Sequence, residues 1–216
     1  MLNFKECLNT NPCIAILRGL DINDACAIAD LIYKSGVRII EVPLNKVGAV
    51  ECIVKLIDHL PQDCLIGAGT VVTEEQVKLV CDIGGSFIIS PNTSKEIITL
   101  AISYHLLPIP GVASVTEACI AYEYGARYLK LFPASSYGVK HMHALRSVMP
   151  DDVSFIPVGG VNASNMGQWL QAGALGVGLG NVLFQSGESL KQVELKLATI
   201  NSALTNYNNK SHLVTI

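Results

Sequence analysis

Short runs of apolar and β-branched residues recur at regular intervals along this chain of 216 residues. They cover Cys13–Gly19, Arg38–Leu44, Leu65–Val71, Phe87–Pro91, Leu106–Val112, Arg127–Pro133, Ser154–Val161 and Ala174–Gly180. Runs that are apolar on both faces are typical of parallel strands that are covered by helices. The spacing of the runs leaves room for one crossover helix after each strand. This repetition predicts a mixed α/β fold built from strand–helix units.

Helical patterns fill the intervals between these runs, for example at Asp24–Lys34 and Thr73–Asp82. Several begin at a capping residue, such as Thr73 with Gln76 or Ser94, and several end at a glycine. Eight strand–helix units in one chain predict a single-domain (β/α)8 TIM barrel over residues 1–216. The alternative is an open, doubly wound sheet, which normally has fewer strands and a GxGxxG motif that this sequence lacks.

Two terminal segments lie outside the repeated units. Residues 2–9 have the pattern of an extra amphipathic helix, which we expect to cover the floor of the barrel. The pattern from Glu188 to Tyr207 predicts the last and longest helix. We expect residues 208–211, which are polar, to form a short frayed tail.

The composition of the chain argues against several classes of function. Hydrophobic residues make up 50% and charged residues 15%, which favours a heavily buried fold and a surface partly covered by identical subunits. A net charge of −3 provides no basic field for nucleic acid. The seven cysteines are scattered and form no CxxC pair, which indicates a reducing cytoplasmic location. No apolar segment is long enough to span a membrane, and no metal-ligand cluster is evident.

Lys130 is the residue that most clearly points to chemistry. It lies within Tyr128-Leu129-Lys130-Leu131-Phe132-Pro133, an apolar run that predicts a buried strand. Burial lowers the pKa of a lysine, and a neutral amine can attack a carbonyl carbon to form a Schiff base. The alternative is a lysine on an edge strand whose ammonium group reaches water beyond its apolar stem.

Two further charged residues lie near the C-terminal ends of predicted strands, where barrels carry their catalytic groups. Glu41 lies between Ile40 and Val42, and a desolvated carboxyl beside a Schiff-base lysine can both donate and accept protons. Arg18 ends the first run, and its planar guanidinium is suited to a substrate carboxylate. An ion pair between Arg18 and Glu41 is an equally good interpretation.

Glycines follow the last two predicted strands. Gly159 and Gly160 allow the backbone to approach a ligand closely, and Gly180 precedes a predicted short helix at residues 181–184. Backbone N–H groups at this place bind phosphate in many barrels, so we predict a phosphate site here. Tight turns without a ligand are the alternative.

Six segments carry a resemblance to a known family. They are Ile14-Ala15-Ile16-Leu17-Arg18-Gly19, Glu41-Val42-Pro43-Leu44, Ile66-Gly67-Ala68-Gly69-Thr70-Val71, Pro110-Gly111, Leu129-Lys130-Leu131-Phe132-Pro133 and Val158-Gly159-Gly160-Val161. Over about residues 14–184 the chain resembles the class I aldolases that cleave 2-keto-3-deoxy-6-phospho sugar acids.

This resemblance implies roles for individual residues. It implies that Lys130 forms the Schiff base and that Glu41 is the acid and base, without a cofactor or a metal. It also implies that a group of residues lines the pyruvyl end of the substrate, namely Arg18, Thr70, Pro91 and Phe132. A second group would bind the phosphate, namely Gly159, Gly160, Gly180 and Asn181. Asn181 replaces a serine that is common in the family, and its amide can still donate a hydrogen bond.

Two branches of the family differ at a few positions. The phosphogluconate branch usually has Glu-Val-Thr-Leu-Arg where this chain has Glu41-Val42-Pro43-Leu44-Asn45, and it tends to have threonine in place of Val158. The chain is more similar to the phosphogalactonate branch, so Asn45 and Val158 are expected at the substrate. The expected reaction is cleavage of 2-dehydro-3-deoxy-6-phosphogalactonate to pyruvate and D-glyceraldehyde 3-phosphate. Cleavage of the C4 epimer, as in KDPG/KHG aldolases, is the alternative.

Two other classes of function are compatible with a sugar-phosphate barrel. The first is an isomerase or synthase in which Lys130 is structural, so that Lys130→Arg would keep measurable turnover. The second is a non-catalytic phospholigand-binding or scaffold barrel, which would bind ligand without releasing pyruvate. The low charged fraction and the family resemblance suggest a homotrimer.

Overall fold

The chain alternates between buried strands and amphipathic helices in a mixed α/β fold. The computed structural model describes residues 3–213, with side chains for residues 3–209. The strands are β1 (Cys13–Ile16), β2 (Ile39–Pro43), β3 (Leu65–Gly69), β4 (Phe87–Ile89), β5 (Leu107–Ile109), β6 (Gly111–Val112), β7 (Tyr128–Leu131), β8 (Ser154–Pro157) and β9 (Val177–Leu179). The helices are α1 (Phe4–Thr10), α2 (Ala25–Lys34), α3 (Ala49–His59), α4 (Glu74–Asp82), α5 (Lys95–Ser103), α6 (Val115–Glu123), α7 (Ala134–Arg146), α8 (Met166–Gln171) and α9 (Leu190–Leu213).

All of the paired strands run parallel and form two sheets. One sheet has the order β5-β4-β3-β2-β1-β9, and the other has the order β6-β7-β8. The sheets adjoin at two places, because only Pro110 separates β5 from β6 and a bridge pairs Val158 with Gly178 of β9. The predicted run Leu106–Val112 is therefore interrupted at Pro110, which has no N–H group to donate to a neighbouring strand.

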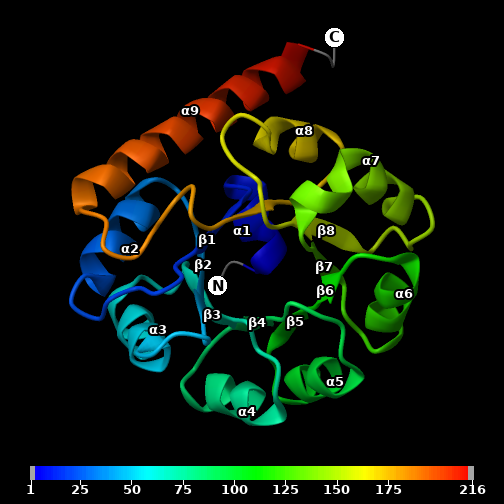
Figure 1. The fold of residues 1–216 in the computed structure, drawn as a ribbon, viewed down its shortest axis with the longest axis horizontal. Helices are drawn as coiled ribbons and strands as arrows, with labels where there is room; N and C mark the ends of the chain where they lie inside the picture. The colour runs from blue at the N-terminus through cyan, green and yellow to red at the C-terminus, as the bar shows by residue number, and fades with distance from the viewer. Residues whose placement is uncertain (1–2, 214–216) are drawn as a thin grey trace.

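The strands separate an inner core from an outer one. Successive side chains of a strand point to opposite faces, so Ile14 and Ile16 of β1 point inward while Ala15 points outward. The outward residues pack against the helices that surround the strands in Figure 1. The inner core is small and includes Ile39, Phe87 and their inward-facing neighbours.

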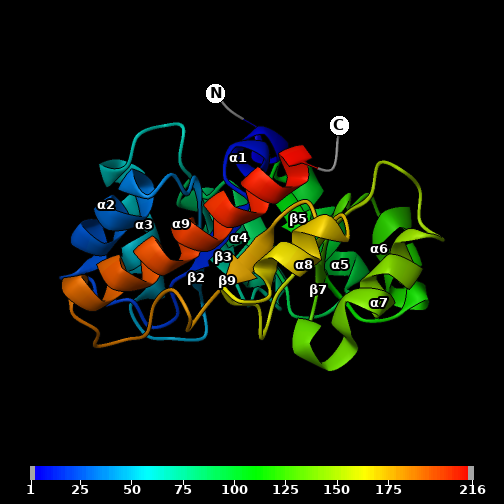
Figure 2. The same ribbon diagram turned by 90° about the horizontal axis from the view of Figure 1, so that it is seen from above.

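Helix α1 covers one end of this inner core. Its side chains Phe4, Cys7 and Leu8 are buried there, and the ring of Phe4 lies 5.8 Å from that of Phe87 and 5.0 Å from that of Tyr128. Figure 1 shows α1 near the middle of the ring of helices, and Figure 2 shows that it lies at one face. The carboxyl ends of the strands are left at the opposite face.

Helices α4 and α5 begin at the capping residues that the sequence predicts. Thr73 and Gln76 form a reciprocal capping box at α4, and the Ser94 hydroxyl accepts a hydrogen bond from the Ile97 N–H at α5. Both predicted caps are confirmed.

Two predictions for the C-terminal part of the chain are wrong. Residues 208–211 continue α9, which runs to Leu213, because no glycine or proline follows Gly187 to end the helix. The predicted short helix after Gly180 is a turn, in which the N–H groups of Leu183 and Phe184 both donate to the Gly180 carbonyl at 2.8 and 3.0 Å. This turn leads into a loop that reaches Gly187 (φ 84°) before α9 begins.

Within residues 3–213, no helix has the length and apolar character needed to cross a bilayer.

Candidate active site

Two ionisable side chains point into the interior because side chains alternate between the two faces of a strand. Glu41 follows the inward-facing Ile39 by two residues, and Lys130 follows Tyr128, which packs on the inner core, by two residues. Both side chains therefore point inward, Glu41 from the middle of β2 and Lys130 from the C-terminal half of β7. The sequence predicted this placement at the C-terminal ends, and the structure brings the two groups close enough to affect each other's charge.

Both groups are desolvated. Glu41 is 2% exposed and Lys130 is 7% exposed, and the Oε2 atom of Glu41 has no hydrogen-bonding partner among the described residues. Burial raises the pKa of the Glu41 carboxyl, although the charges of Lys130 and Arg18 partly offset this effect. Burial also lowers the pKa of Lys130, helped by Arg18 and opposed by Glu41. Each shift favours the uncharged form, which for lysine is the nucleophilic one.

Phe132 lies directly beside the amine. The Nζ of Lys130 is 4.6 Å from the centroid of the Phe132 ring, and Phe132 is 38% exposed. A Cβ added at Gly159 would come within 3.3 Å of the same ring, so the glycine allows the ring to lie close to the end of β8. Phe132 is thus positioned to shield the amine from bulk water.

Gly69 is a site residue that sequence reasoning missed. A Cβ added to Gly69, the last residue of β3, would collide with the Oε1 atom of Glu41. The carboxyl group therefore occupies the space that any other side chain at position 69 would fill. The available signal was a glycine inside a strand, which often marks a close approach of another group. The next residue, Thr70, has φ 57°, an uncommon conformation for a β-branched residue.

Arg18 lies at the same end of the strands without an ion pair to Glu41. Its Nη1 instead donates to the Oδ1 of Asn45 at 3.4 Å, and both residues are exposed. Among residues 3–209, the guanidinium makes no other hydrogen bond or ion pair, so its other donors can bind a ligand. Pro91 is half-buried after β4, and its carbonyl oxygen lies where a Cβ of Gly111 would be.

The glycines expected at a phosphate lie on two neighbouring loops. Gly159 (φ 90°) and Gly160 (φ 81°) follow β8, and both adopt the left-handed conformation that favours glycine. Gly180 and the exposed Asn181 follow β9. Val158, directly before Gly159, is buried in the inner core and pairs with Gly178 of β9. All of the predicted substrate positions are therefore at the carboxyl ends of the strands.

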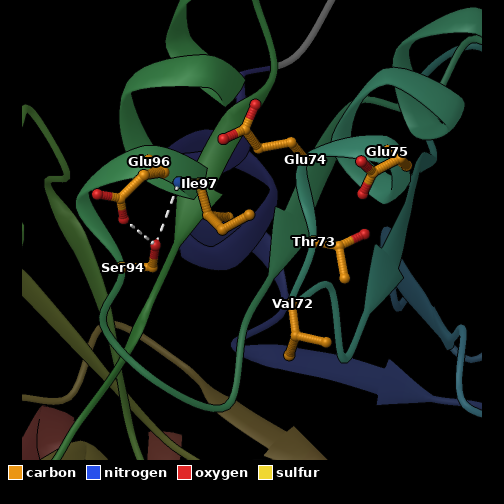
Figure 3. Close-up of a pocket in the computed structure, with 7 residues that line it drawn as sticks. All are labelled: Val72, Thr73, Glu74, Glu75, Ser94, Glu96 and Ile97. Atoms are coloured by element: carbon orange, nitrogen blue, oxygen red, sulfur yellow. Dashed lines mark hydrogen bonds between the residues drawn. The ribbon is translucent and has the colours of Figure 1, made fainter.

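A separate hollow of about 400 Å³ lies between the starts of α4 and α5 (Figure 3). Glu74, Glu75 and Glu96 line it, and hydrogen bonds from backbone and hydroxyl groups lower the pKa of the Glu75 and Glu96 carboxyls. This hollow is open and acidic, so it would repel a phosphorylated acid. It does not include Glu41 or Lys130.

Known proteins resemble this chain over most of its length. A family model described as KDPG and KHG aldolase matches residues 4–198. The 2-dehydro-3-deoxy-6-phosphogalactonate aldolase of Escherichia coli K12 is 38% identical over 87% of this chain and 91% of its own length. The KHG/KDPG aldolase of the same organism is 30% identical over 77% of this chain and 78% of its own length.

Solved structures agree with these relatives. The native KDPGal structure has a TM-score of 0.88 and 37% identity, and the match covers 92% of this chain and 96% of that one. The KDPG aldolase of Legionella pneumophila, captured with pyruvate as a covalent carbinolamine intermediate, has a TM-score of 0.82 and 29% identity over 92% and 97% of the two chains. The fold, the extent of these matches and the family model together show that this chain belongs to the KDPG and KHG aldolase family.

Proposed function

We propose that the chain is a class I aldolase that cleaves 2-dehydro-3-deoxy-6-phosphogalactonate to pyruvate and D-glyceraldehyde 3-phosphate. The observation that carries this proposal is a buried Lys130, with a lowered pKa, in the same interior as a buried Glu41 with a raised one. The 38% identity to a phosphogalactonate aldolase supports the choice of substrate.

In the first half of the reaction, Lys130 forms a covalent bond to the substrate. The neutral amine attacks the C2 ketone, and the resulting carbinolamine loses water. Glu41 in its acid form supplies the proton that the departing hydroxyl needs, and its raised pKa favours that form. The product is a protonated imine, whose nitrogen can accept an electron pair.

In the second half, the carbon–carbon bond breaks. Glu41, now a carboxylate, takes the proton of the C4 hydroxyl, and the electrons of the C3–C4 bond move into the imine to give an enamine. D-glyceraldehyde 3-phosphate leaves. A proton then adds to C3, and water hydrolyses the restored imine to release pyruvate and the free Lys130 amine.

The remaining residues bind the two ends of the substrate. Arg18 binds the carboxylate, and Thr70, Pro91 and Phe132 surround the pyruvyl carbons. The phosphate lies against Gly159, Gly160, Gly180 and Asn181, whose loops adjoin the same end of the strands. Asn45 and Val158 lie between these two ends, where they contact the hydroxyl-bearing carbons.

The test of this proposal is reduction with borohydride in the presence of pyruvate alone. We expect one reduced pyruvyl adduct, which peptide mapping locates at Lys130. The Lys130→Met variant provides the control and should remain unmodified. An adduct at another lysine, or no adduct, would contradict the mechanism.

The C4 epimer, 2-dehydro-3-deoxy-6-phosphogluconate, is the second candidate substrate. The family model and the 30% identical KHG/KDPG aldolase favour it. Measuring kcat/KM on both epimers distinguishes the candidates, and we expect the galactonate substrate to react faster. Val158→Thr adds a hydroxyl at the position that separates the branches, so it should shift the ratio toward the gluconate epimer.

We also propose that the strands close into one complete (β/α)8 barrel and that the protein is a cytoplasmic homotrimer. Continuity of β5 with β6 and the bridge between Val158 and Gly178 support closure. Exposed apolar side chains such as Ile102 and Ile120 support burial between subunits. Light scattering should give three times the chain mass of 23.1 kDa.

A further inference from the structure

A partly buried ion pair between Lys196 and Glu188 attaches the loop at residues 180–188 to helix α9. Lys196 of α9 places its Nζ 2.9 Å from the carbonyl oxygen of Asn181 and 2.5 Å from the Oε1 of Glu188. The side chains of Lys196 and Glu188 are 26% and 14% exposed, so water screens this pair less than a pair on the open surface. One ammonium group therefore joins the first part of the loop to its end.

The charge on Glu188 keeps this ammonium in place. Burial by itself would raise the pKa of the Glu188 carboxyl, but hydrogen bonds from Lys196 and from the N–H of Gln185 outweigh it and lower that pKa. The carboxylate stays ionised at neutral pH and balances the charge of Lys196. Lys196 consequently acts on the shape of the loop rather than as a free cation near the substrate.

The backbone of the loop is held at several points, whereas the side chain of Asn181 is exposed. Leu183 and Phe184 are buried, and their N–H groups both donate to the Gly180 carbonyl. Asn181 is exposed, and its side-chain amide has no hydrogen-bonding partner among the described residues. The backbone carbonyl of Asn181 is held while its amide remains available to a ligand.

The same loop also lies next to the loop that carries Arg18, because β9 and β1 are paired neighbours. A Cβ added at Gly19 would lie 3.4 Å from the Cβ of Ser186, and Gly19 directly follows Arg18. Residues 180–188 thus lie between α9 and the loop that carries Arg18.

We propose that Lys196 is a positioning residue for the phosphate end of the substrate. By binding the Asn181 carbonyl and Glu188, it holds Gly180 and Asn181 where their donors meet the phosphate. This inference rests on the proposed function. It assigns part of the binding energy of the substrate to a residue that does not touch the substrate. A loop that is already ordered loses less conformational entropy when the ligand binds.

The alternative is that Lys196 only attaches α9 to the barrel. Lys196→Met keeps most of the aliphatic stem and removes the donors, so it separates these two roles. The probe for the phosphate end is the inhibition constant of glycerol 3-phosphate. The probe for the pyruvyl end is the pyruvate concentration that half-saturates borohydride trapping. A merely structural role would lower Tm and leave the ratio of the two constants unchanged.

We expect Lys196→Met to raise the glycerol 3-phosphate inhibition constant about tenfold, the effect of losing one charged hydrogen bond. The pyruvate constant should stay within about twofold of wild type, since nothing in the pyruvyl site changes. Lys191→Met is the matched control, because Lys191 lies on the same helix in an exposed ion pair with Glu194 at 3.3 Å. This control should leave both constants as they are in wild type.

Equal changes in both constants, or no change in either, would overturn the proposal. If Lys196→Met does not fold, Glu188→Gln provides the test of the proposal. This variant retains a hydrogen-bond acceptor but removes the negative charge that balances Lys196. We expect it to raise the phosphate-end constant alone, and an unchanged ratio would overturn the proposal. Wild type that fails to form the pyruvate adduct would instead refute the proposed function, since trapping requires no phosphate group.

Discussion

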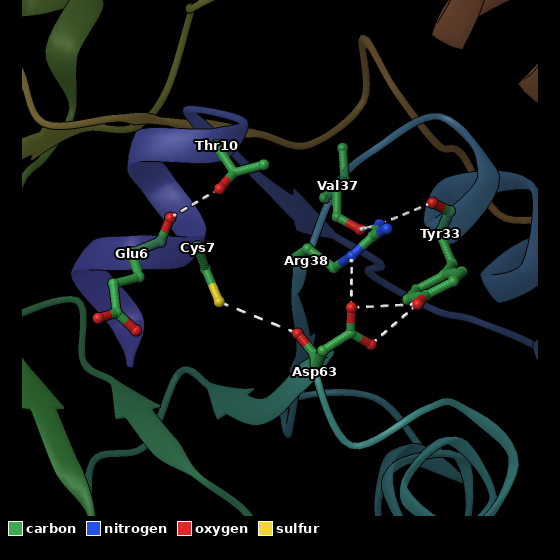
Figure 4. A network of polar contacts seen from close by, with 7 residues as sticks. All are labelled: Glu6, Cys7, Thr10, Tyr33, Val37, Arg38 and Asp63. Carbon is green, nitrogen blue, oxygen red and sulfur yellow. Dashed lines mark hydrogen bonds and ion pairs between the residues drawn. The ribbon is translucent and has the colours of Figure 1, made fainter. Parts of the chain in front are cut away.

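Two segments far apart in the chain carry the same arrangement of side chains at the start of a strand. In the first, Arg38 precedes β2, with its guanidinium 3.8 Å from the ring centroid of Tyr33 and its Nε 3.1 Å from the Oδ2 of Asp63 (Figure 4). Its Nη1 also donates to the Tyr33 carbonyl at 2.8 Å. We call this arrangement the Arg38 cluster.

The second segment repeats this arrangement before β7. The guanidinium of Arg127 is 4.1 Å from the ring centroid of Tyr122, and its Nε is 2.7 Å from the Oδ2 of Asp152. Its Nη1 donates to the Tyr122 carbonyl at 3.1 Å. In each cluster the tyrosine, arginine and aspartate follow one another at the same spacing in the sequence. We call this arrangement the Arg127 cluster.

The two segments differ where the chemistry is expected. Three residues after the arginine, one strand carries Glu41 and the other carries Lys130. Six residues after the aspartate, the first segment has Gly69, which leaves room for the Glu41 carboxyl, and the second has Val158. The N-terminal ends of these strands thus share one stabilising arrangement, while the residues farther along carry the two different groups that we propose for catalysis. Stability and chemistry are assigned to opposite ends of the strands.

The largest effect is expected from removing the reactive group of the second strand. Lys130→Met should reduce kcat by about 10³-fold or more, because no other described group is placed to form the Schiff base. Lys130→Arg should lose activity to the same extent, since a guanidinium does not become a nucleophile. A lactate dehydrogenase-coupled assay of pyruvate release measures both. Substantial turnover by Lys130→Arg would favour the isomerase or synthase class.

Replacing the reactive group of the first strand should have a smaller effect and a distinct pH signature. Glu41→Gln should lower kcat by about 10²- to 10³-fold through loss of proton transfer. In wild type, kcat/KM should rise with pH as Lys130 loses its proton, with a midpoint below the usual lysine value of 10.5. Ionised Glu41 raises the pKa of Lys130, so Glu41→Gln should move this midpoint to lower pH. A midpoint that moves upward would contradict the assigned interaction.

Substitution of Gly69, which lies against the Glu41 carboxyl, tests why the corresponding positions of the two segments hold glycine in one and valine in the other. Gly69→Ala would place a methyl group against the Glu41 carboxyl, and we expect kcat to fall by about 10²-fold as that group is displaced. Gly167→Ala is the control, because its Cβ would make only ordinary contact with Tyr207 at 3.7 Å. Steady-state kinetics on both variants measures the difference. Wild-type kcat in Gly69→Ala would show that the carboxyl position is not critical.

The smallest effects on activity are expected from the shared clusters. Arg38→Ala should lower the free energy of unfolding by about 2 kcal/mol, and Arg127→Ala by about 1 kcal/mol. The difference arises because Arg38 is less exposed (21% against 39%) and because the Tyr33 hydroxyl also donates to Asp63. Urea denaturation measures both values. A larger loss for Arg127→Ala would reverse the ranking of the two clusters.

Sequence reasoning predicted the parts of the molecule that depend on local patterns. Apolar runs located the strands, and the inward placement of Glu41 and Lys130 follows from the two-residue period of a strand. The resemblance supplied the remaining site residues. Thr73 and Ser94 located two helix starts, because a capping hydrogen bond spans only three residues.

The features that sequence reasoning missed depend on contacts between distant segments. Gly69 is important because a side chain from a neighbouring strand occupies its space, and Lys196 because α9 lies behind the loop at Asn181. The residues after Gly180 include no glycine or proline before Gly187 that would exclude a helix, but they form a turn in which Leu183 and Phe184 are buried. Spacing alone could not show whether Arg18 would bind Asn45 or Glu41.

The position of α1 has a consequence for the order of events. Because Phe4, Cys7 and Leu8 block one end of the interior, both reactants must use the same entrance at the other end. Lys130 is buried beside the ring of Phe132, whereas Asn181 is exposed. For an aldolase running in the synthetic direction, the keto acid must then arrive first and the aldehyde second. In cleavage the aldehyde departs before the keto acid, which makes the kinetic mechanism ordered.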